Sequence, residues 1–262
     1  MCKVIAIANQ KGGCAKTVSS ASLAFGLAES GKKVLLIDAD PQGSLTITLG
    51  FHEPDELEDT LVDIISKVVN EEDIPEGFGV LKHSENIDLI PSNIGLSALE
   101  VSLINAMSRE LILKLYVDSV RDKYDFVIID CMPSLGIITV NALSCADRVI
   151  IPVQAAYLPV KGLQQLIKTI YTIKRRLNPV LEIEGILITM VDYRTNYAKE
   201  IIAEINQVYG KTIPVYQVEI PLSVRAAEVT SVGKSIYEYD PKGKVAFAYM
   251  SLTKEVLSKE AE

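Results

Sequence analysis

A glycine-rich turn lies between an apolar strand and a helix at the start of this chain, and this arrangement restricts the fold more than any other feature. Residues 3–8 (KVIAIA) have the apolar, β-branched character of a buried strand. The turn at residues 9–17 (NQKGGCAKT) follows, and a helix is expected over residues 16–30. Inward-facing backbone amides ahead of a helix N-terminus make a cradle for phosphate groups. A turn that only reverses the chain is the alternative.

The residue types in this turn suit a phosphate cradle. Gly12 and Gly13 let the backbone turn tightly and approach a ligand. Lys16 can reach the β- and γ-phosphates of ATP, and the hydroxyl of Thr17 can coordinate Mg²⁺. Strand, turn, Lys-Thr pair and helix therefore occur in the order that a nucleotide site requires.

The turn departs from the common phosphate-loop pattern G-x-x-x-x-G-K-[ST]. Gln10 and Ala15 occupy its two glycine positions, so the turn matches only a deviant form, K-G-G-x-x-K-T. The extra lysine of this form, Lys11, stands at the entrance of the loop. From the residues alone, Lys11 is most simply a solvated surface lysine; a group that reaches a second nucleotide is the alternative.

Acidic residues end two apolar strands. Residues 33–38 (KVLLID) lead into Asp38 and Asp40, and residues 125–130 (DFVIID) end at Asp130. Open α/β sheets bind ligands at the carboxyl ends of their strands, which is where these acids fall. Of Asp38 and Asp40, one can hold a water ligand of Mg²⁺ and the other can orient the attacking water, and Asp130 is expected to bind Mg²⁺ through water. Acids that merely start turns are the alternative.

Strand and helix patterns alternate along the rest of the chain, which predicts an α/β fold with a doubly wound, mostly parallel sheet flanked by helices. Residues 51–85 are acidic and irregular apart from a helical stretch at 57–69, and we interpret them as a variable surface excursion. Residues 221–244 receive no assignment. Without a linker or repeat, residues 1–262 are expected to form a single P-loop ATPase domain. Further strands are expected at 86–91, 148–153, 185–190 and 213–218, and further helices at 97–120, 135–146, 160–177, 197–209 and 245–258.

Composition argues against several other classes of protein. The chain has 262 residues, 48% hydrophobic and 23% charged, which is ordinary for a globular protein. Its cysteines are far apart and form no CxxC pair, which disfavours a secreted disulfide scaffold and a metal-cluster carrier. No apolar run reaches the roughly 18 residues of a membrane span. The start lacks the layout of a signal peptide.

The charge distribution leaves nucleic-acid binding open. A net charge of −8 argues against a surface that is basic all round, but it permits one basic face. One predicted helix carries several cations, and more follow towards the C-terminus. A basic face and an ordinary solvated helix surface are both compatible with this pattern. The cations of that helix are Lys168, Lys174, Arg175 and Arg176.

Taken together, these motifs resemble the ParA/Soj/MinD group of ATPases, which carry the deviant phosphate loop. KGGCAKT, LLIDADPQGS, FVIIDCMPSLGIITVNAL and GILITMVDYRTN follow the order of that group's motifs, and the resemblance runs from residue 3 to about residue 257. The DPQG, PSLG…NAL and TM-x-D-x-R-T-N blocks are most similar to Soj-type ParA proteins.

The resemblance implies an ATP-dependent DNA-partitioning ATPase that hydrolyses ATP slowly with Mg²⁺. ATP would join two subunits face to face as a homodimer, with Lys11 of each subunit reaching the phosphates bound by the other. The dimer would bind nonspecific DNA, and a ParB/Spo0J-like activator would stimulate hydrolysis. Such a protein is expected to be cytoplasmic and nucleoid-associated.

The same resemblance assigns roles by position. Its catalytic residues are Lys11, Lys16 and Asp40, its metal ligands Thr17, Asp38 and Asp130, and its DNA-binding residues Arg194 and Arg225. Its nucleotide-binding residues are Lys11, Gly12, Gly13, Cys14, Ala15, Lys16, Thr17 and Val18, with Pro221 and Ser223 at the base.

Two segments depart from the group's pattern. Cys131 and Met132 replace the usual Thr-Pro after Asp130, ahead of residues 133–135 (PSL), which are expected to form a switch segment that senses the γ-phosphate. Residues 220–225 (IPLSVR) lack the Arg-Asn that usually follows the proline, which puts the base contacts in doubt.

The leading alternative is a MinD-like ATPase that cycles on and off a membrane. That function needs a C-terminal amphipathic helix with basic flanks. Residues 257–262 (LSKEAE) are acidic and short, so no stable membrane anchor is expected. A non-catalytic nucleotide-binding scaffold is a further alternative, but the acids at Asp38, Asp40 and Asp130 are all present.

Overall fold

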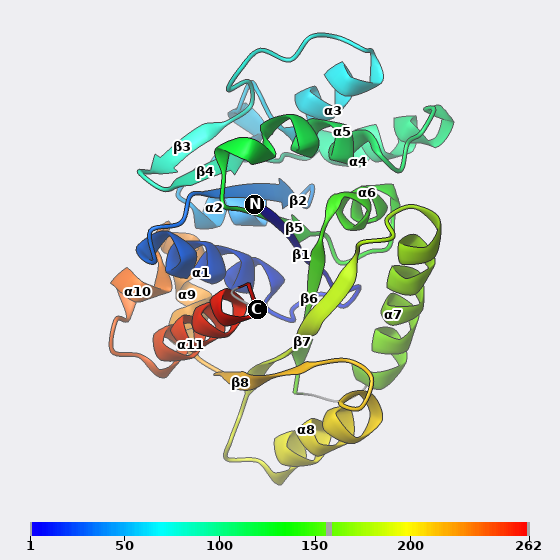
Figure 1. The fold of residues 1–262 in the computed structure, drawn as a ribbon. Helices are drawn as coiled ribbons and strands as arrows, with labels where there is room; N and C mark the ends of the chain where they lie inside the picture. Colours follow the sequence, from blue (N-terminus) through cyan, green and yellow to red (C-terminus); the bar gives the residue numbers. More distant parts are fainter. Residues whose placement is uncertain (1, 156–158, 261–262) are drawn as a thin grey trace.

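A mostly parallel sheet forms the centre of the molecule (Figure 1). The computed structural model describes residues 2–155 and 159–260. Within them, eight strands form a sheet in the order β3-β4-β2-β5-β1-β6-β7-β8, and only the pair β3 and β4 is antiparallel. The predicted α/β fold is confirmed. The strands are β1 (Lys3–Ile7), β2 (Val34–Ala39), β3 (Leu81–Ser84), β4 (Ile87–Ile90), β5 (Phe126–Cys131), β6 (Arg148–Gln154), β7 (Glu182–Val191) and β8 (Val215–Pro221).

Helices cover both faces of this sheet (Figure 1). Successive residues of a strand point to opposite faces, so Val4 and Ala6 of β1 enter one apolar core while Ile5 and Ile7 enter the other. Helices α3 to α8 pack on the first core, and α1, α2, α9, α10 and α11 pack on the second. The helices are α1 (Lys16–Glu29), α2 (Ser44–Thr48), α3 (Leu61–Val69), α4 (Gly95–Ser102), α5 (Ile112–Val120), α6 (Ile137–Cys145), α7 (Pro159–Arg176), α8 (Asn196–Tyr209), α9 (Val224–Val232), α10 (Ile236–Tyr239) and α11 (Lys244–Lys259), with 3₁₀ turns η1 (Pro54–Glu56), η2 (Leu103–Asn105) and η3 (Arg121–Lys123).

The central strands are buried on both faces, as their unbroken apolar runs predict. Every residue of β2 and of β5 is buried. Because β1, β2, β5 and β6 are parallel, their C-terminal ends lie at one edge of the sheet, which we call the carboxyl edge. The loops that leave these four strands are therefore neighbours in space.

The helix expected over residues 97–120 is wrong as a single element. It consists of α4, η2 and α5, and the chain leaves helical conformation between η2 and α5. Ser108 adopts a left-handed conformation there, with φ 49°. The amide of Leu113 then donates a 3.0 Å hydrogen bond to Oδ1 of Asn141, which satisfies a free donor at the start of α5.

Residues 51–85 are more ordered than their acidic pattern indicates. Helix α3 begins after Thr60, whose backbone and side chain form a reciprocal capping box with Asp63. Leu61 and Ile64 of α3 are fully buried in the core, so the helix is part of the packed fold. The short edge strand β3 follows, and its alternating half-exposed and exposed residues explain why the apolar pattern did not predict it.

Residues 221–244, which received no assignment, contain α9 and α10. Ser235 caps α10 by accepting a 3.1 Å hydrogen bond from the amide of Glu238. Gly233 ends α9 with φ 68°, the left-handed geometry that glycine adopts readily. Among the residues that the structure describes, no helix is long and apolar enough to cross a bilayer.

Candidate nucleotide-binding site

The loop between β1 and α1 is held open by hydrogen bonds at both of its ends. Asn9 is buried, donates a 2.7 Å hydrogen bond to the carbonyl of Pro152 in β6, and accepts one of 3.0 Å from the amide of Lys11. At the other end, the hydroxyl of Thr189 in β7 donates a 3.1 Å hydrogen bond to the carbonyl of Cys14. Neighbouring strands of the sheet thus fix the path of the loop.

The loop backbone takes the left-handed conformation twice. Gly13 has φ 70°, and a Cβ there would meet no other atom, so the loop has an open surface at this point. Ala15 has φ 64° and ψ 31° directly ahead of α1, in the position where the common phosphate-loop pattern has glycine. For an L-residue this conformation costs roughly 1–2 kcal/mol. The loop therefore keeps its geometry with alanine in place of glycine at position 15, but the backbone of Ala15 is strained.

The two lysines of the loop occupy different environments. Lys16 is 7% exposed, and its ammonium donates a 3.3 Å hydrogen bond to the carbonyl of Lys11 across the loop. The residue Lys11 itself is exposed. Among the described residues, no ion pair holds its ammonium. Lys16 is thus positioned inside the loop and Lys11 at its rim, as the sequence pattern predicts.

Asp130, the last acid of β5, is held by two hydroxyls of α1. Thr17 donates a 2.7 Å hydrogen bond to Oδ2, and Ser20 donates one of 2.8 Å to Oδ1. Ser20 also bonds the carbonyl of Lys16, one helical turn before it. The carboxylate therefore lies against the first turn of α1, beside the loop.

Asp38 lies directly beside Asp130, because the parallel register of β2 and β5 pairs the two residues. Asp38 is fully buried, and its Oδ2 accepts 2.8 Å hydrogen bonds from both the amide and the hydroxyl of Thr46 in α2. Asp40 follows on the way out of β2 and is half-buried; its carboxylate accepts a 3.0 Å bond from the amide of Gln42. The three acids therefore gather at the carboxyl edge.

Burial favours the neutral forms of the two inner acids. Burial, and then the charge of Asp130, raise the pKa of Asp38 to about 7. Burial raises the pKa of Asp130 to about 6, although hydrogen bonds from Thr17 and Ser20 and the charge of Lys16 act in the opposite direction. Two buried carboxylates beside one ammonium favour the approach of a further cation.

The donor set fits Mg²⁺. Carboxylates and a hydroxyl are the hard oxygen ligands that this ion prefers. Among the described residues there is no cluster of three or more His, Cys, Asp or Glu side chains that could enclose a metal ion. An ion held by few protein oxygens, with water and phosphate completing its shell, is the usual arrangement for magnesium with a nucleotide.

Four residues of this site escaped the sequence analysis. Ser20 and Thr46 hold the two inner acids, and Asn9 and Thr189 fix the loop. The only sequence signal was for Ser20, which lies one helical turn after Lys16 and so on the same face of α1. The partners of the other three come from the tertiary fold.

The structure places the expected base-contact residues at the end of β8. Pro221 ends this strand, and Ser223 is the N-cap of α9 without a capping hydrogen bond from its side chain. Between them, the amide of Leu222 donates a 3.0 Å hydrogen bond to the carbonyl of Val191, the last residue of β7. Both strands are parallel to β6, so this segment also lies at the carboxyl edge. Its base contacts stay a prediction.

The two expected DNA-binding arginines are exposed, and each pairs with an acid of its own chain. Arg194 is 86% exposed and makes two 2.7 Å bonds to Asp192, which lower the pKa of that carboxyl to about 2. Arg225 is 63% exposed and bonds Asp240 at 2.7 Å. Surface pairs of this kind are weak, so a phosphate can compete for either arginine. DNA binding by both residues stays a prediction.

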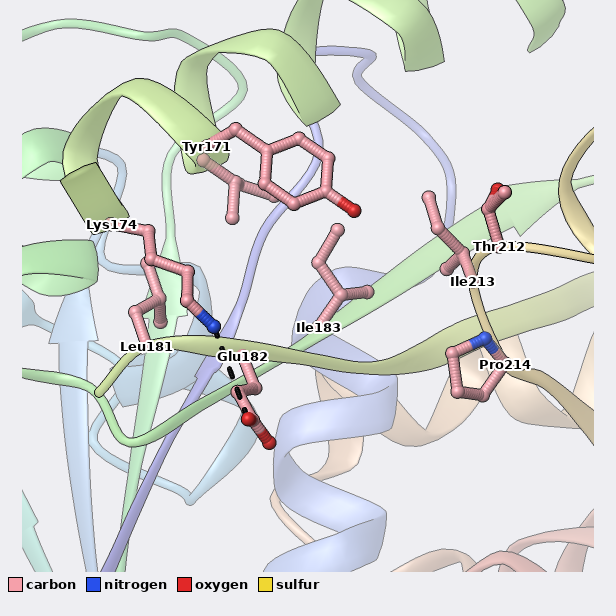
Figure 2. A pocket seen from close by; sticks show the side chains of 9 residues that line it. Tyr171, Lys174, Leu181, Glu182, Ile183, Thr212, Ile213 and Pro214 are labelled. Atoms are coloured by element: carbon pink, nitrogen blue, oxygen red, sulfur yellow. Dashed lines mark ion pairs between the residues drawn. The ribbon is translucent and has the colours of Figure 1, made fainter. Parts of the chain in front are cut away.

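A hollow of about 240 Å³ lies away from the loop, between α7, the start of β7 and the segment before β8 (Figure 2). Figure 2 shows Lys174 reaching across its rim to Glu182, at 3.9 Å. Its other lining groups are mainly apolar, with Tyr171 above them. No residue of the phosphate loop lines this hollow, so it does not belong to the nucleotide site.

Comparison with known proteins agrees with this geometry. The family described as "AAA domain" matches residues 2–183. The sporulation initiation inhibitor protein Soj of Bacillus subtilis is 44% identical, over 98% of this chain and 98% of its own. The chromosome partitioning protein ParA of Myxococcus xanthus is 38% identical, over 98% of this chain and 89% of its own.

A solved structure with bound nucleotide is also similar. It is described as cobyrinic acid a,c-diamide synthase from Mycobacterium smegmatis with bound ADP and magnesium. It is 35% identical to this chain, covers 98% of this chain and 94% of its own, and superposes with a TM-score of 0.84. The same protein has been solved with an ATP analogue and magnesium.

Proposed function

The chain belongs to the ParA/Soj family of P-loop ATPases, homologous to chromosome-partitioning ATPases, and from this membership we propose that it works as an ATP-driven partition switch. ATP joins two copies face to face, the dimer binds nonspecific DNA, and hydrolysis stimulated by a ParB-like partner separates the copies. We treat residues 1–262 as one ATPase domain, with 51–85 as its variable part. The protein is then cytoplasmic and resides on the nucleoid.

The hydrogen-bonded set Thr17–Asp130–Ser20, beside Asp38 and Lys16, carries this proposal. A bound magnesium ion supplies charge neutralisation for the β- and γ-phosphates. Thr17 would coordinate the ion, and Asp130 and Asp38 would hold its water ligands. Ser20 would keep Asp130 in place.

The loop and Asp40 supply the remaining chemistry. Lys16 leaves the carbonyl of Lys11 and bonds the β- and γ-phosphates, while the amides of residues 12–18 surround the phosphate oxygens. Asp40 is half-buried at the end of β2, where its carboxylate can orient the attacking water. Pro221 and Ser223 contact the base.

Lys11 gives a physical reason for dimerisation. Lys11 is an exposed residue at the entrance of the loop. In a face-to-face dimer it reaches the nucleotide of the second copy and stabilises the charge that develops during hydrolysis. Nucleotide binding and dimerisation are then coupled, because each site is incomplete without its partner.

DNA binding by the dimer rests on the exposed cations. Arg194 and Arg225 exchange Asp192 and Asp240 for phosphates of the DNA backbone. Dimerisation doubles the number of phosphates that one particle neutralises, and affinity rises steeply with that number. The monomer therefore binds DNA weakly and the ATP dimer binds it well.

ATP hydrolysis measured alone, with nonspecific duplex DNA and with anionic liposomes tests the proposed function. We expect Mg²⁺-dependent hydrolysis that DNA stimulates and liposomes leave unchanged, and retention of DNA only with ATP. Stimulation by liposomes with indifference to DNA would instead support a membrane-cycling ATPase.

A further inference from the structure

Helix α4 carries apolar side chains on two opposite faces. Leu96 and the following Leu103 are buried in the core. On the outer side, Ile94 directly before α4, Val101 within α4 and Ile104 in the following turn η2 are 56%, 67% and 58% exposed. Their spacing, with Ser97 and Ala98 between them, places them on one side of this helical segment. We call Ile94, Ser97, Ala98, Val101 and Ile104 the α4 face.

A helix that is apolar on both sides normally lies between two packed surfaces. Single exposed apolar residues are common, but three large ones along the segment of α4 and η2 are a patch of the kind that marks an interaction site. Met107 extends the patch, since it is 93% exposed just beyond η2. The chain covers the inner face of α4 and leaves the outer face exposed.

The position of α4 connects this face to the nucleotide site. α4 follows β4, which runs parallel to β2 and so ends at the carboxyl edge. Its Glu100 lies against Gly136, where a Cβ would overlap the carboxylate. Gly136 directly follows residues 133–135, the expected switch segment. Oε1 of Glu100 is buried there without a hydrogen-bond partner, so this contact is easily disturbed.

We infer that the α4 face packs against the same face of a second copy of this chain in the ATP-bound dimer. This inference rests on the proposed function and adds an apolar contact outside the nucleotide loops. Two copies with a net charge of −8 each repel one another, so they approach best where the surface is uncharged. The α4 face carries no charged residue, and a symmetric contact of like on like suits apolar and small side chains.

The α4 face is too small to form a stable interface by itself. A stable interface buries roughly 20–30 residues a side, far more than this face offers. It is therefore part of a larger surface, and the neighbouring carboxyl edge with its exposed Lys11 and Gly12 supplies the rest.

Sedimentation velocity of the full chain with a non-hydrolysable ATP analogue and Mg²⁺ tests this inference. We expect Val101→Lys and Ile104→Lys to raise the dimer dissociation constant by about 30-fold or more, as for residues at the centre of an interface. Val180→Lys is the matched control, because Val180 is also 67% exposed but lies between α7 and β7. It should change the constant less than about 3-fold. ATP affinity of the monomer should be equal in all three variants.

The outcomes separate this inference from the proposed function. A wild-type chain that stays monomeric with the analogue would overturn the dimer itself, and with it the role of the α4 face. If the wild type dimerises, and Val101→Lys and Ile104→Lys have the same dimer dissociation constant as Val180→Lys, the role of the α4 face alone would be overturned. Variants that dimerise normally but no longer respond to DNA or to an added protein would overturn it as well, because the face would then serve a different partner.

Discussion

The hydroxyl of Thr17 donates a 2.7 Å hydrogen bond to Oδ2 of Asp130, and this contact joins the phosphate loop to the sheet. Thr17 is the second residue of α1, and Asp130 is the last but one of β5, 113 residues later in the chain. Asp38 lies beside Asp130 in the adjacent strand, so the metal ligands expected from separate motifs occupy one place. The folded chain presents them before any ligand arrives, which reduces the cost of ordering them on binding.

The buried acids should make the nucleotide-free protein less stable as pH rises. The pKa of Asp38 is 3.8 in an ordinary setting and about 7 in the fold, and that of Asp130 is about 6. Between these values the folded state binds more protons than the unfolded state, so the free energy of unfolding falls with rising pH. Each acid contributes at most about 1.4 kcal/mol per pH unit.

Chemical denaturation at several pH values between about 5 and 7 measures this slope. The unfolding free energy of Asp38→Asn should depend less steeply on pH than that of the wild type, because the asparagine side chain has no proton to lose. Mg²⁺ with ATP should also flatten the wild-type slope, since the bound cation favours the ionised acids. A wild-type slope equal to that of Asp38→Asn in the absence of ligand would contradict the assigned pKa shift.

Replacing Ala15 by glycine should stabilise the protein. Ala15 is left-handed, with φ 64°, and glycine removes a strain of roughly 1–2 kcal/mol. Glycine also adds freedom to the unfolded chain, which offsets about 0.5–1 kcal/mol. The net gain in unfolding free energy should be about 0.5–1 kcal/mol in denaturant titrations.

Ala28→Gly is the control for this experiment, because Ala28 lies within the right-handed helix α1. The unfolding free energy of Ala28→Gly should fall by about 1 kcal/mol. If both glycine variants were destabilised alike, Ala15 would not be strained in solution.

Asp40→Ala should separate ATP binding from hydrolysis. Asp40 has none of the hydroxyl contacts that fix Asp38 and Asp130, so its loss should leave the loop intact. Phosphate release should fall by about 100-fold or more, the usual contribution of a positioned base. Gel filtration with ATP should then show an accumulated dimer. The exposed Asp59→Ala should behave as wild type; a variant of Asp40 that eluted only as monomer with ATP would count against the assigned role.

Loss of Arg194 and Arg225 should weaken DNA binding without affecting ATP. We expect the double variant Arg194→Ala, Arg225→Ala to bind nonspecific duplex DNA at least about 10-fold more weakly, and to show a shallower dependence on salt. Lys33→Ala is the control, because Lys33 is exposed just before β2, at the opposite end of that strand from the nucleotide site. Equal DNA retention by the double variant and the control at low salt would remove both arginines from the interface.

The sequence predicted the central elements well because their local and tertiary preferences agree. β2 and β5 are unbroken apolar runs and are buried on both faces, so their pattern does not depend on which neighbours they find. The loop of β1 was predicted for a similar reason, since glycines, Lys16 and Thr17 suit one geometry only. The proximity of Asp38 and Asp130 followed from parallel strands ending at one edge.

Other features depend on partners that no local pattern reveals. Ser20 and Thr46 are ordinary hydroxyl residues until the fold brings Asp130 and Asp38 against them. α4 and α5 read as one helix because the break at Ser108 shows only as a short polar interruption. The exposed side of α4 is apolar like its core side, so an apolar pattern does not distinguish the two.

Calorimetric titration of ATP with Mg²⁺ into the wild type and into Lys16→Ala tests the phosphate site most directly. Lys33→Ala is the control, because Lys33 is an exposed lysine just before β2, at the opposite end of that strand from the loop. We predict measurable heat with one ATP per chain in the wild type and in Lys33→Ala, and at least about 100-fold weaker binding in Lys16→Ala. No heat in the wild type, or equal affinity in Lys16→Ala, would contradict the site.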